Sequence, residues 1–332
     1  MNGVPSLDPD LIGRFERDLH VLMAPEARLG IAVSGGPDSL ALLLLAAATR
    51  PGRVEAATID HGLRDGSRAE AEMVADVCSG LAVPHAVLTA AWADKPTTAI
   101  QERAREKRYC LLAGWASDRQ LDAIATAHHL DDQAETLLMR LARGAGVRGL
   151  AGIRPASTVP GAAMPLLRPL LGWRRAELER IVACAGLHPA RDPSNEDEQF
   201  ERVRIRRALA ESDWLEPESL AASAANLRDA DAALDWAADQ EWARAVNEGP
   251  AEILYHAADT PPEIRRRIAS RALSRLATEG AGAGLRGREL DRLLWVLAGG
   301  GRSTLRGVLC IGGETWRFVA APNRTRPVGN LR

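Results

Sequence analysis

The segment with the clearest capacity for chemistry reads SGGPDS and follows a short apolar run. Two glycines let a backbone turn tightly and approach a ligand closely. A helix that begins near Asp38 would point free N–H groups and the positive end of its dipole at this loop. We therefore expect an anion site made of backbone and hydroxyl groups from Ser34, Gly35, Gly36, Pro37, Asp38 and Ser39. The alternative is a plain turn in which Asp38 or Ser39 caps the helix.

A second polar segment, HHLDDQAET, begins at His128. Asp132 and Glu135 are three residues apart, which puts both on one face of a helix start. One interpretation is a carboxylate pair that grips a cation, either metal or ammonium, with Asp131 and His129 helping to position it. The other is a capping box, in which Asp132 caps the helix and Glu135 reaches back. A tight zinc site is disfavoured, because zinc prefers several nitrogen or sulfur ligands in fixed geometry.

Two further groups of polar residues extend the candidate site. Asp60 and His61 follow a second apolar run, and Arg105 lies three residues before Arg108 on one helix face. A capped loop and a solvated basic face are the respective alternatives. Residues 139–207 hold 13 arginines and 7 acidic residues, so this stretch carries +6 in a chain of net charge −2. A basic region beside an anion site suits a polyanionic substrate, and solvated helix faces are the alternative.

The elements that must position these residues alternate along the first half of the chain. Short apolar strands are expected at 29–33, 53–59, 82–88 and 121–127, and each precedes a helix, at 38–49, 67–80, 98–117 and 132–142. Four strand–helix units in series predict a doubly wound parallel sheet. Ligands on such a sheet bind at the carboxyl ends of the strands, where the polar segments lie.

The second half of the chain has a different pattern. Glycines and prolines between residues 144 and 169 predict a loop, and helices are expected at 173–185, 200–247, 262–278 and 286–298. The chain closes with a predicted hairpin at 303–320, whose turn is Gly312-Gly313. We therefore expect an α/β domain over residues 1–207 and a smaller, mostly helical domain over 208–332.

Composition narrows the class of protein. The chain has 332 residues, of which 46% are hydrophobic and 26% charged, and this excludes disordered and collagen-like chains. Its four cysteines form no CxxC pair, which fits a reduced cytosol better than a disulfide scaffold. The longest apolar run, from Leu40 to Ala48, is far shorter than the roughly 20 residues of a membrane span. We expect a cytoplasmic protein without a membrane segment.

Only two of the 42 basic residues are lysines, Lys95 and Lys107. A GC-rich genome explains this bias, and phosphate binding by arginine is the alternative. Neither lysine follows a glycine, so a Walker A loop is excluded. The GxGxxG strings at 144–149 and 282–287 follow predicted helices and not strands, so they do not predict a dinucleotide site.

The SGGPDS segment resembles the pyrophosphatase loop, or PP-loop, of enzymes that split ATP into AMP and pyrophosphate. GMP synthetase, NAD synthetase, argininosuccinate synthetase and several tRNA-modifying enzymes share this loop. The resemblance implies an adenine nucleotide α-hydrolase-like fold, with ATP as substrate and Mg²⁺ beside its phosphates. Asp38 would then lie by the phosphates and the Mg²⁺ ion, and the implied chemistry is adenylation of an oxygen followed by displacement of AMP.

The ordered set SGGPDSLALL, DHGLR, ARxxRY, HHLDDQAET, RGAGVRGLAGI, RPLL and RDPSN is similar to that of bacterial tRNA(Ile)-lysidine synthetases. The resemblance covers residues 29–207, and the chain is identified as a short form. One departure follows Arg202, where Val203 stands in place of the family's usual Asn.

The family resemblance implies a specific reaction. ATP would adenylate the wobble cytidine of the isoleucine tRNA with a CAU anticodon, and the ε-amine of free L-lysine would displace AMP. Cytidine becomes lysidine, which changes codon and charging identity from methionine to isoleucine. Asp38 is expected to handle Mg²⁺ and protons, Arg105 the activated intermediate, and Asp132 and Glu135 the lysine cation, with His129 nearby.

The implied binding sites form two further sets. The ATP site comprises Ser34, Gly35, Gly36, Pro37, Asp38, Ser39, Asp60 and His61, and the tRNA contacts comprise Arg143, Arg148, Arg202 and Arg206. The oligomeric state is not fixed by the sequence, and a homodimer stays open. The alternative enzyme is a tRNA thiolation enzyme, which shares the loop but usually needs a CxxC pair or a catalytic cysteine. A nucleotide-responsive binding protein without turnover is the alternative of a different class.

Overall fold

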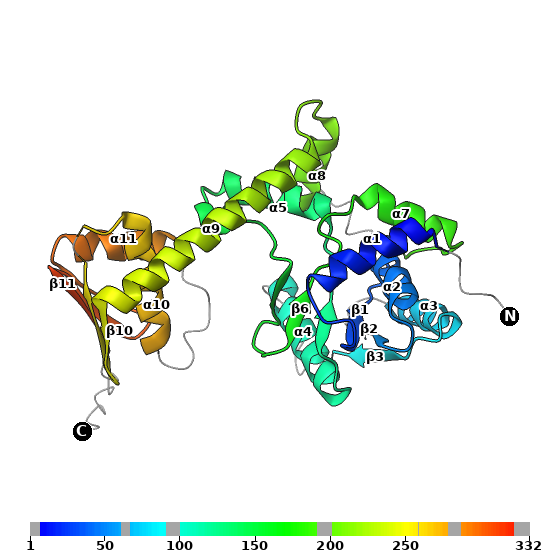
Figure 1. Ribbon diagram of the computed structural model, residues 1–332, viewed down its shortest axis with the longest axis horizontal. Helices are drawn as coiled ribbons and strands as arrows, with labels where there is room; N and C mark the ends of the chain where they lie inside the picture. Colours follow the sequence, from blue (N-terminus) through cyan, green and yellow to red (C-terminus); the bar gives the residue numbers. More distant parts are fainter. Residues whose placement is uncertain are drawn as a thin grey trace, which may run out of the picture. The chain divides into compact units, whose positions relative to one another are not determined.

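The structure is a computed structural model that describes residues 7–60, 67–90, 100–190, 201–257, 259–277 and 287–321 (Figure 1). The chain divides into two compact units. Unit 1 comprises Met1–Gly144 and Gly149–Ala225, and unit 2 comprises Ala145–Arg148 and Asn226–Arg332. Residue 207, at which the sequence analysis divides the chain, lies inside a helix of unit 1.

Unit 1 is built from alternating strands and helices. Its elements are α1 (Pro9–His20), β1 (Leu29–Ala32), α2 (Pro37–Thr49), β2 (Val54–Asp60), α3 (Ser67–Gly80), β3 (His85–Thr89), α4 (Ile100–Asp118), β4 (Ala123–Ala125), α5 (Leu130–Ala142), α6 (Val147–Leu150), β5 (Ala156–Thr158), β6 (Pro165–Leu167), α7 (Arg175–Cys184), α8 (Glu201–Glu211) and the start of α9 (Pro217–Ala245). Within this list, Val147 and Arg148 of α6 belong to unit 2.

The sheet of unit 1 has the order β3-β2-β1-β4-β6-β5. Strands β1, β2, β3, β4 and β6 pair in parallel, and only β5 pairs antiparallel. The predicted doubly wound parallel sheet is therefore confirmed. After β1 the chain adds β2 and β3 on one side of β1 and then adds β4 on the other side. The strand order therefore switches between β1 and β4. Ligands of such sheets bind in the crevice at this switch point.

Both faces of this sheet are covered, so it is buried as parallel sheets usually are. Side chains of α1, α2, α3 and α7 form one core with alternate residues of β1, and α4 forms a second core on the other face. The apolar helix α2 buries a continuous run from Ser39 to Ala46. On the opposite face Gly30 leaves room for the ring of Trp115, so β1 has a different neighbour on each side.

Two sequence expectations for unit 1 need correction. The predicted loop of residues 144–169 holds a short helix and the hairpin strands β5 and β6, which are too short and too rich in flanking Gly and Pro to show a period. The single helical segment expected at 200–247 is broken between α8 and α9, where Pro217 starts the second helix. Proline suits the first turn of a helix and ends the preceding one.

Unit 2 packs helices on an antiparallel sheet. It contains the rest of α9, then β7 (Val246–Glu248), β8 (Glu252–His256), α10 (Pro262–Leu276), α11 (Gly287–Ala298), β9 (Arg302–Leu305), β10 (Val308–Ile311) and β11 (Thr315–Ala320). The sheet order is β7-β8-β11-β10-β9. Its core includes Tyr255 and Trp316, whose rings meet edge to face with centroids 5.7 Å apart.

The sequence analysis reduced this sheet to one closing hairpin. Gly312-Gly313 does join β10 to β11, as expected, but Arg306-Gly307 forms another turn, in which both residues have positive φ. Such a turn matches the twist of paired strands. Strands β7 and β8 were missed because β7 follows α9 directly, with no turn residue between Ala245 and Val246.

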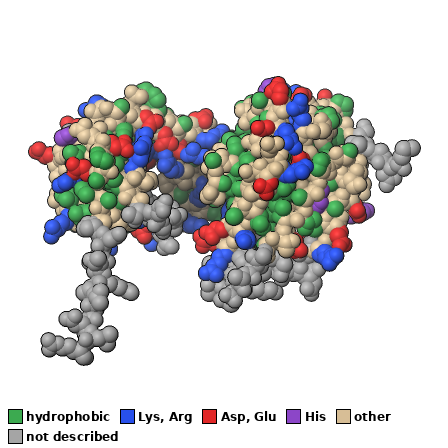
Figure 2. Space-filling view, turned by 90° about the horizontal axis from the view of Figure 1, so that it is seen from below, with side chains coloured by type: hydrophobic (Ala, Val, Ile, Leu, Met, Phe, Trp, Pro, Cys, Tyr) green, Lys and Arg blue, Asp and Glu red, His purple; other side chains and the backbone are tan. Residues whose placement is uncertain are grey.

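On the face drawn in Figure 2, basic and acidic side chains lie interspersed with hydrophobic and uncharged ones. No helix in the described part of the chain combines the length and apolar character that crossing a membrane requires.

Replacement of Gly30 by Ala tests the close packing of β1 against α4. A Cβ atom at Gly30 would lie 2.7 Å from Trp115 and 2.8 Å from Leu121, well inside van der Waals contact. We expect Gly30→Ala to lower the free energy of unfolding by about 1–3 kcal/mol, as overpacked cores do. Chemical denaturation measures the change. Gly114→Ala, on α4 with no atom within 4 Å of the added Cβ, is the control, and equal losses in both would contradict this account.

Candidate active site

The SGGPDS segment forms the turn between β1 and α2. Gly35 has a φ of +82°, a conformation that side chains disfavour, and Gly36 is the N-cap residue of α2. Ser39 Oγ donates a hydrogen bond to the Gly36 carbonyl at 3.0 Å and accepts one from the Ser34 N–H at 3.1 Å. No side chain caps α2, so the alternative of a plain side-chain cap is wrong. The N–H groups of the first turn remain available to an anion.

Asp38 lies in the first turn of α2 and faces the start of α5. Its Oδ2 atom is 3.6 Å from Nε2 of His129. Its Oδ1 atom is buried and has no hydrogen-bond partner among the described residues. Buried polar atoms in native proteins almost always have a partner, so this oxygen is a candidate ligand for a cation.

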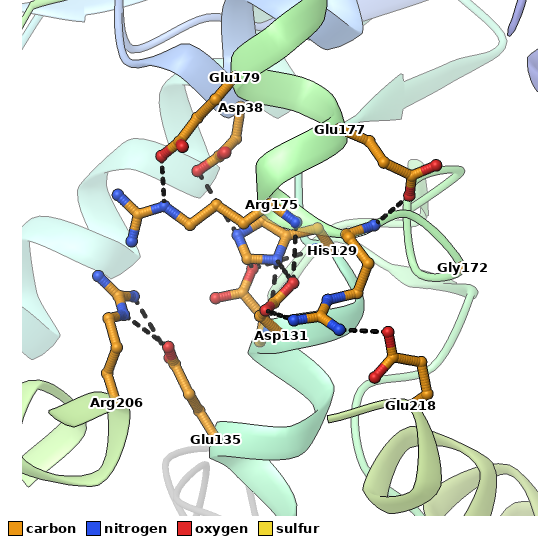
Figure 3. A network of polar contacts seen from close by, with 12 residues as sticks. Asp38, His129, Asp131, Glu135, Gly172, Arg175, Glu177, Glu179, Arg206 and Glu218 are labelled. Atoms are coloured by element: carbon orange, nitrogen blue, oxygen red, sulfur yellow. Dashed lines mark hydrogen bonds and ion pairs between the residues drawn. The ribbon is translucent and has the colours of Figure 1, made fainter. Parts of the chain in front are cut away.

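His129 is a buried cation surrounded by carboxylates (Figure 3). Its ring nitrogens lie 3.6 Å from oxygens of Asp38, Asp131 and Asp132. Burial opposes the charge on the ring, but the three carboxylates outweigh it and raise the pKa of His129 to about 10. The imidazole is therefore protonated at neutral pH and cannot act as a base.

Helix α5 begins with a capping box, although with other partners than the predicted ones. His129, and not Asp132, is the N-cap residue, because the helix starts at Leu130. The backbone N–H of His129 donates to Asp132 Oδ2 at 3.1 Å. The reciprocal contact, from Asp132 N to Nδ1 of His129, is 3.4 Å long, and a protonated ring cannot accept it. The hydrogen bond from the His129 N–H to Asp132 therefore caps the helix. The capping role predicted for Glu135 is wrong.

Asp131 lies beside Nδ1 of His129 and is itself held by the start of α7. It accepts a hydrogen bond from the backbone N–H of Arg175 at 2.8 Å and pairs with Nη2 of Arg174 at 3.3 Å. Burial disfavours the charge of Asp131, but His129, the Arg175 N–H and Arg174 outweigh burial and hold its pKa well below the usual range. Asp131 thus joins the starts of α5 and α7.

Glu135 lies one turn further along α5, where it pairs with two arginines of α8. Its side chain is 2% exposed. Arg206 Nε donates to Oε1 at 2.7 Å, and Arg202 Nε lies 3.2 Å from Oε2. Arg202 also donates to Thr136 Oγ1 at 3.3 Å. The buried carboxylate is therefore neutralised within the protein.

A cavity of about 450 Å³ opens where these elements meet, at the carboxyl ends of β1, β2 and β4. Most of the predicted site residues line it: Ser34, Gly36, Pro37, Asp38, Ser39, Arg105, His129, Asp132, Arg202 and Arg206. Gly35 shapes the turn behind it, and Glu135 is buried behind the two arginines. Asp60 ends β2 without lining the cavity, and His61 lies outside the described residues.

Sequence reasoning did not assign several other lining residues, among them Thr58, Arg108 and His128. Burial lowers the pKa of His128 to about 4, so its ring is neutral, and Nδ1 shares a hydrogen bond with Thr126 Oγ1 at 2.9 Å. The adjacent pair of histidines was a usable signal for His128. The sequence carries no comparable signal for Thr58, because Thr58 looks like any other residue of a buried strand.

Positive charge reaches the cavity from α4. The Arg105 guanidinium lies 5.0 Å from the centre of the Tyr109 ring, which holds it by a cation–π contact. Burial lowers the pKa of Arg108, one turn away. The cavity therefore combines a backbone anion site, the carboxylates of Asp38, Glu70 and Asp132, and several guanidinium groups. This set is suited to binding a phosphate ester and an ammonium group together.

Arg143 and Arg148, two of the predicted tRNA contacts, are not among the residues that line the cavity. Arg143 forms an ion pair with Glu201. Arg148 belongs to unit 2, where it pairs with Asp235 and lies 3.6 Å from Asp231. Both arginine side chains are more than half exposed.

Cysteine chemistry is not supported at this site. Cys78 and Cys310 are buried, and burial raises the pKa of each thiol to about 12. Cys110 and Cys184 are exposed on helices. None of the four lines the cavity formed by the described residues.

Comparison with known proteins agrees with this geometry. A family model described as a PP-loop domain matches residues 12–212. The chain is 48% identical over 314 residues to the tRNA(Ile)-lysidine synthase of Novosphingobium aromaticivorans, with 93% of each chain covered. It is 42% identical over 312 residues to the tRNA(Ile)-lysidine synthase of Zymomonas mobilis, again with 93% of each chain covered.

A solved structure supports the fold independently. The U34-tRNA thiolase NcsA from Methanococcus maripaludis, with its [4Fe-4S] cluster, matches with a TM-score of 0.53 and 15% sequence identity. The match covers 68% of this chain and 80% of that chain. At this identity the likeness shows a shared fold and carries nothing about the reaction.

The charge of His129 can be tested through stability. Its pKa of about 10 exceeds the ordinary value of about 6.5, so between these values the folded protein keeps a proton that the unfolded chain releases. We expect the free energy of unfolding to fall as pH rises from about 7 to about 8.5, and His129→Asn to flatten this dependence. Chemical denaturation across that range measures it. Parallel curves for the two proteins would contradict a charged His129.

Proposed function

This chain belongs to the tRNA(Ile)-lysidine synthase family, and on that premise we propose that it joins free L-lysine to the wobble cytidine of the CAU-anticodon isoleucine tRNA. ATP is consumed and AMP and pyrophosphate are released. The observation that carries this proposal is the meeting of the SGGPDS loop, Asp38 and Asp132 in one cavity. An anion site there lies beside carboxylates that can receive an amine.

The reaction divides into two displacements. The cytosine carbonyl oxygen attacks the α-phosphorus of ATP, and pyrophosphate leaves toward the N–H groups at the start of α2. The ε-amine of lysine then adds to the activated ring carbon, the carbon–oxygen bond breaks, and AMP departs with that oxygen. Adenylation is needed because an amide-like oxygen is a poor leaving group. Arg105, which lines the cavity, is proposed to stabilise the adenylated intermediate.

Proton transfer in this cavity is constrained by His129. Lysine enters as an ammonium ion and must lose a proton before its nitrogen can attack. His129 is already protonated, so it cannot accept that proton. Among the acceptors that line the cavity are the carboxylates of Asp38, Glu70 and Asp132 and the neutral ring of His128. We assign the lysine ammonium to Asp132, whose position His129 fixes.

Mg²⁺ is proposed as the metal that accompanies ATP. Its fit rests on Asp38 Oδ1, which is buried without a partner among the described residues. Mg²⁺ is commonly held by one or two carboxylates together with substrate phosphates, so a larger protein ligand set is not required. When bound, it would neutralise phosphate charge beside the loop.

We propose that Arg143 and Arg148 contact the tRNA. Arg143 and Arg148 are exposed, and the carboxylates with which they form ion pairs, Glu201 and Asp235, are partly exposed, so a phosphate could replace them. We propose that unit 2 also contacts the tRNA, and that the reaction takes place in the cytoplasm. Arg202 and Arg206 are better placed to contact a small substrate, since both line the cavity.

Replacement of Asp38 tests the ATP half of the proposal. We expect Asp38→Ala to abolish ATP-dependent incorporation of radiolabelled lysine into the tRNA transcript while circular dichroism shows a folded protein. The loss follows because Asp38 supplies a carboxylate, with one buried oxygen, beside the proposed phosphate site. Asp10→Ala, in the first turn of α1 and exposed, is the matched control and should keep full activity. Full activity in Asp38→Ala would refute the role.

Replacement of Asp132 tests the lysine half. Asn keeps the oxygen that accepts from the His129 N–H but removes the charge that attracts an ammonium ion. We expect Asp132→Asn to raise the KM for lysine by about 10- to 100-fold, the worth of a charged hydrogen bond, and to change the KM for ATP far less. Steady-state kinetics with each substrate varied measures both constants. An equal rise in the two would argue against a lysine site at Asp132.

A further inference from the structure

Arg168 is the arginine of the RPLL segment, and it takes no part in the function proposed above. It follows β6 directly and is 8% exposed. Its Nη1 atom donates to the Arg154 carbonyl at 2.8 Å and to Ser157 Oγ at 3.1 Å. Its Nε atom is buried and has no hydrogen-bond partner among the described residues. Arginine is rarely this buried unless a charged group pairs with it, so the position of Arg168 is unusual.

The charge of Arg168 has no carboxylate partner in the described part of the chain. Burial lowers the pKa of its guanidinium, Tyr109 favours the charge, and Arg105 opposes it. Arg50 is a useful contrast, because it is 7% exposed and also donates to backbone carbonyls. Burial lowers the pKa of Arg50 too, but two nearby glutamates favour its charge. Positive charge is therefore left uncompensated at Arg168, beside Tyr109.

Tyr109 connects Arg168 to the cavity. It lines the cavity from α4, is 4% exposed, and shares a core with Leu112 of α4 and Leu166 of β6. Arg168 donates a hydrogen bond to the Tyr109 hydroxyl oxygen, because a guanidinium can only donate. The centre of the same ring lies 5.0 Å from the guanidinium carbon of Arg105, which also lines the cavity. One buried ring is thus held at its oxygen and holds an arginine at its face.

The wall of the cavity that α4 forms is suited to an anion. Arg105 and Arg108 line it, and Arg168 adds a third positive charge beside Tyr109. The carboxylates that line the cavity among the described residues come from α2, α3 and α5, and none comes from α4. Such a wall attracts a phosphate group and repels an ammonium ion.

Resting on the function proposed above, we propose that Arg168 is a positioning residue that acts through Tyr109 and fixes the guanidinium of Arg105 for the adenylated intermediate. The phosphate of that intermediate is an anion, which this wall receives. The long side chain of Arg105 has many rotamers, and a cation–π contact holds it in one place only where the ring itself is fixed. Arg168 fixes the ring by its oxygen. Displacement of a positioned group by about 1 Å can lower a rate by about 100-fold, so Arg168 can control the reaction without touching the substrate.

A double-mutant cycle between Arg168 and Tyr109 tests this link. Arg168→Met removes the donor, and Tyr109→Phe removes the acceptor but keeps the ring beside Arg105. We measure kcat for lysine incorporation into the tRNA transcript per molecule that binds ATP, so unfolded protein does not count. We expect each single variant to lower kcat by about 10- to 100-fold, and the double variant to lose no more than about twofold beyond the slower single, because all three break one link. The KM for lysine should stay unchanged.

Arg50→Met is the matched control, because Arg50 is as buried as Arg168 and is not among the residues that line the cavity. It should keep the kcat of wild type, although the midpoint of its chemical denaturation falls as the hydrogen bonds to the carbonyls are lost. Combined with Tyr109→Phe, it should give the kcat of Tyr109→Phe alone. Arg168→Lys keeps a charged donor without the planar fork and should show an intermediate kcat.

Losses that multiply in the double variant would overturn the proposal, because they would show that Arg168 and Tyr109 act independently. A wild-type kcat in Arg168→Met would overturn it as well. A raised KM for lysine at unchanged kcat would also overturn it, and would assign this wall to the amino acid. If the wild-type protein adds no lysine to the transcript, the proposed function itself fails, which none of the other results implies.

Discussion

The buried positive charge of His129 is the interaction on which the arrangement of this site depends. His129 is only 2% exposed. A buried cation is energetically costly unless carboxylates surround it, and three carboxylates surround this one. Those carboxylates come from α2 and α5, and Asp131 extends the cluster to the first turn of α7. One imidazolium therefore links the SGGPDS loop at the start of α2 to the carboxylates at the start of α5. The strand order places the crevice, because the chain adds strands on one side of β1 before α4 and on the other side after it, so the order switches between β1 and β4. These two parallel strands directly precede α2 and α5.

Residues close together in the sequence were predictable, and residues brought together by tertiary packing were not. The SGGPDS loop and the parallel sheet follow from local signals, namely glycines after a buried strand and a regular strand–helix alternation. Glu135 shows the limit. Its spacing from Asp132 suggested a cap or a cation grip, yet its partners lie 67 and 71 residues further along the chain, on α8. No local pattern encodes that pairing. The same limit hid the sheet of unit 2, whose first strands are short and directly follow a long helix.

The bias toward arginine takes on a structural meaning here. Guanidinium groups that the sequence analysis grouped as one basic region are divided among separate tasks. Arg174 pairs with Asp131 at the start of α7, Arg143 with Glu201 on the surface, and Arg206 with buried Glu135. The net charge of −2 is therefore small because positive and negative side chains are nearly equal in number, and many of them pair locally. The functional information lies in where the excess positive charge remains, which is in the cavity.

The identity of the group added to the tRNA tests the central claim most directly. Purified protein would be incubated with ATP, lysine and transcripts of the isoleucine tRNA that differ only at the wobble base, and the modified nucleoside identified by mass spectrometry. The account predicts lysine on the wobble cytidine, with one pyrophosphate released for each lysine added, and no addition when the base is uridine. Exchange of oxygen for sulfur, or pyrophosphate release without lysine, would contradict it.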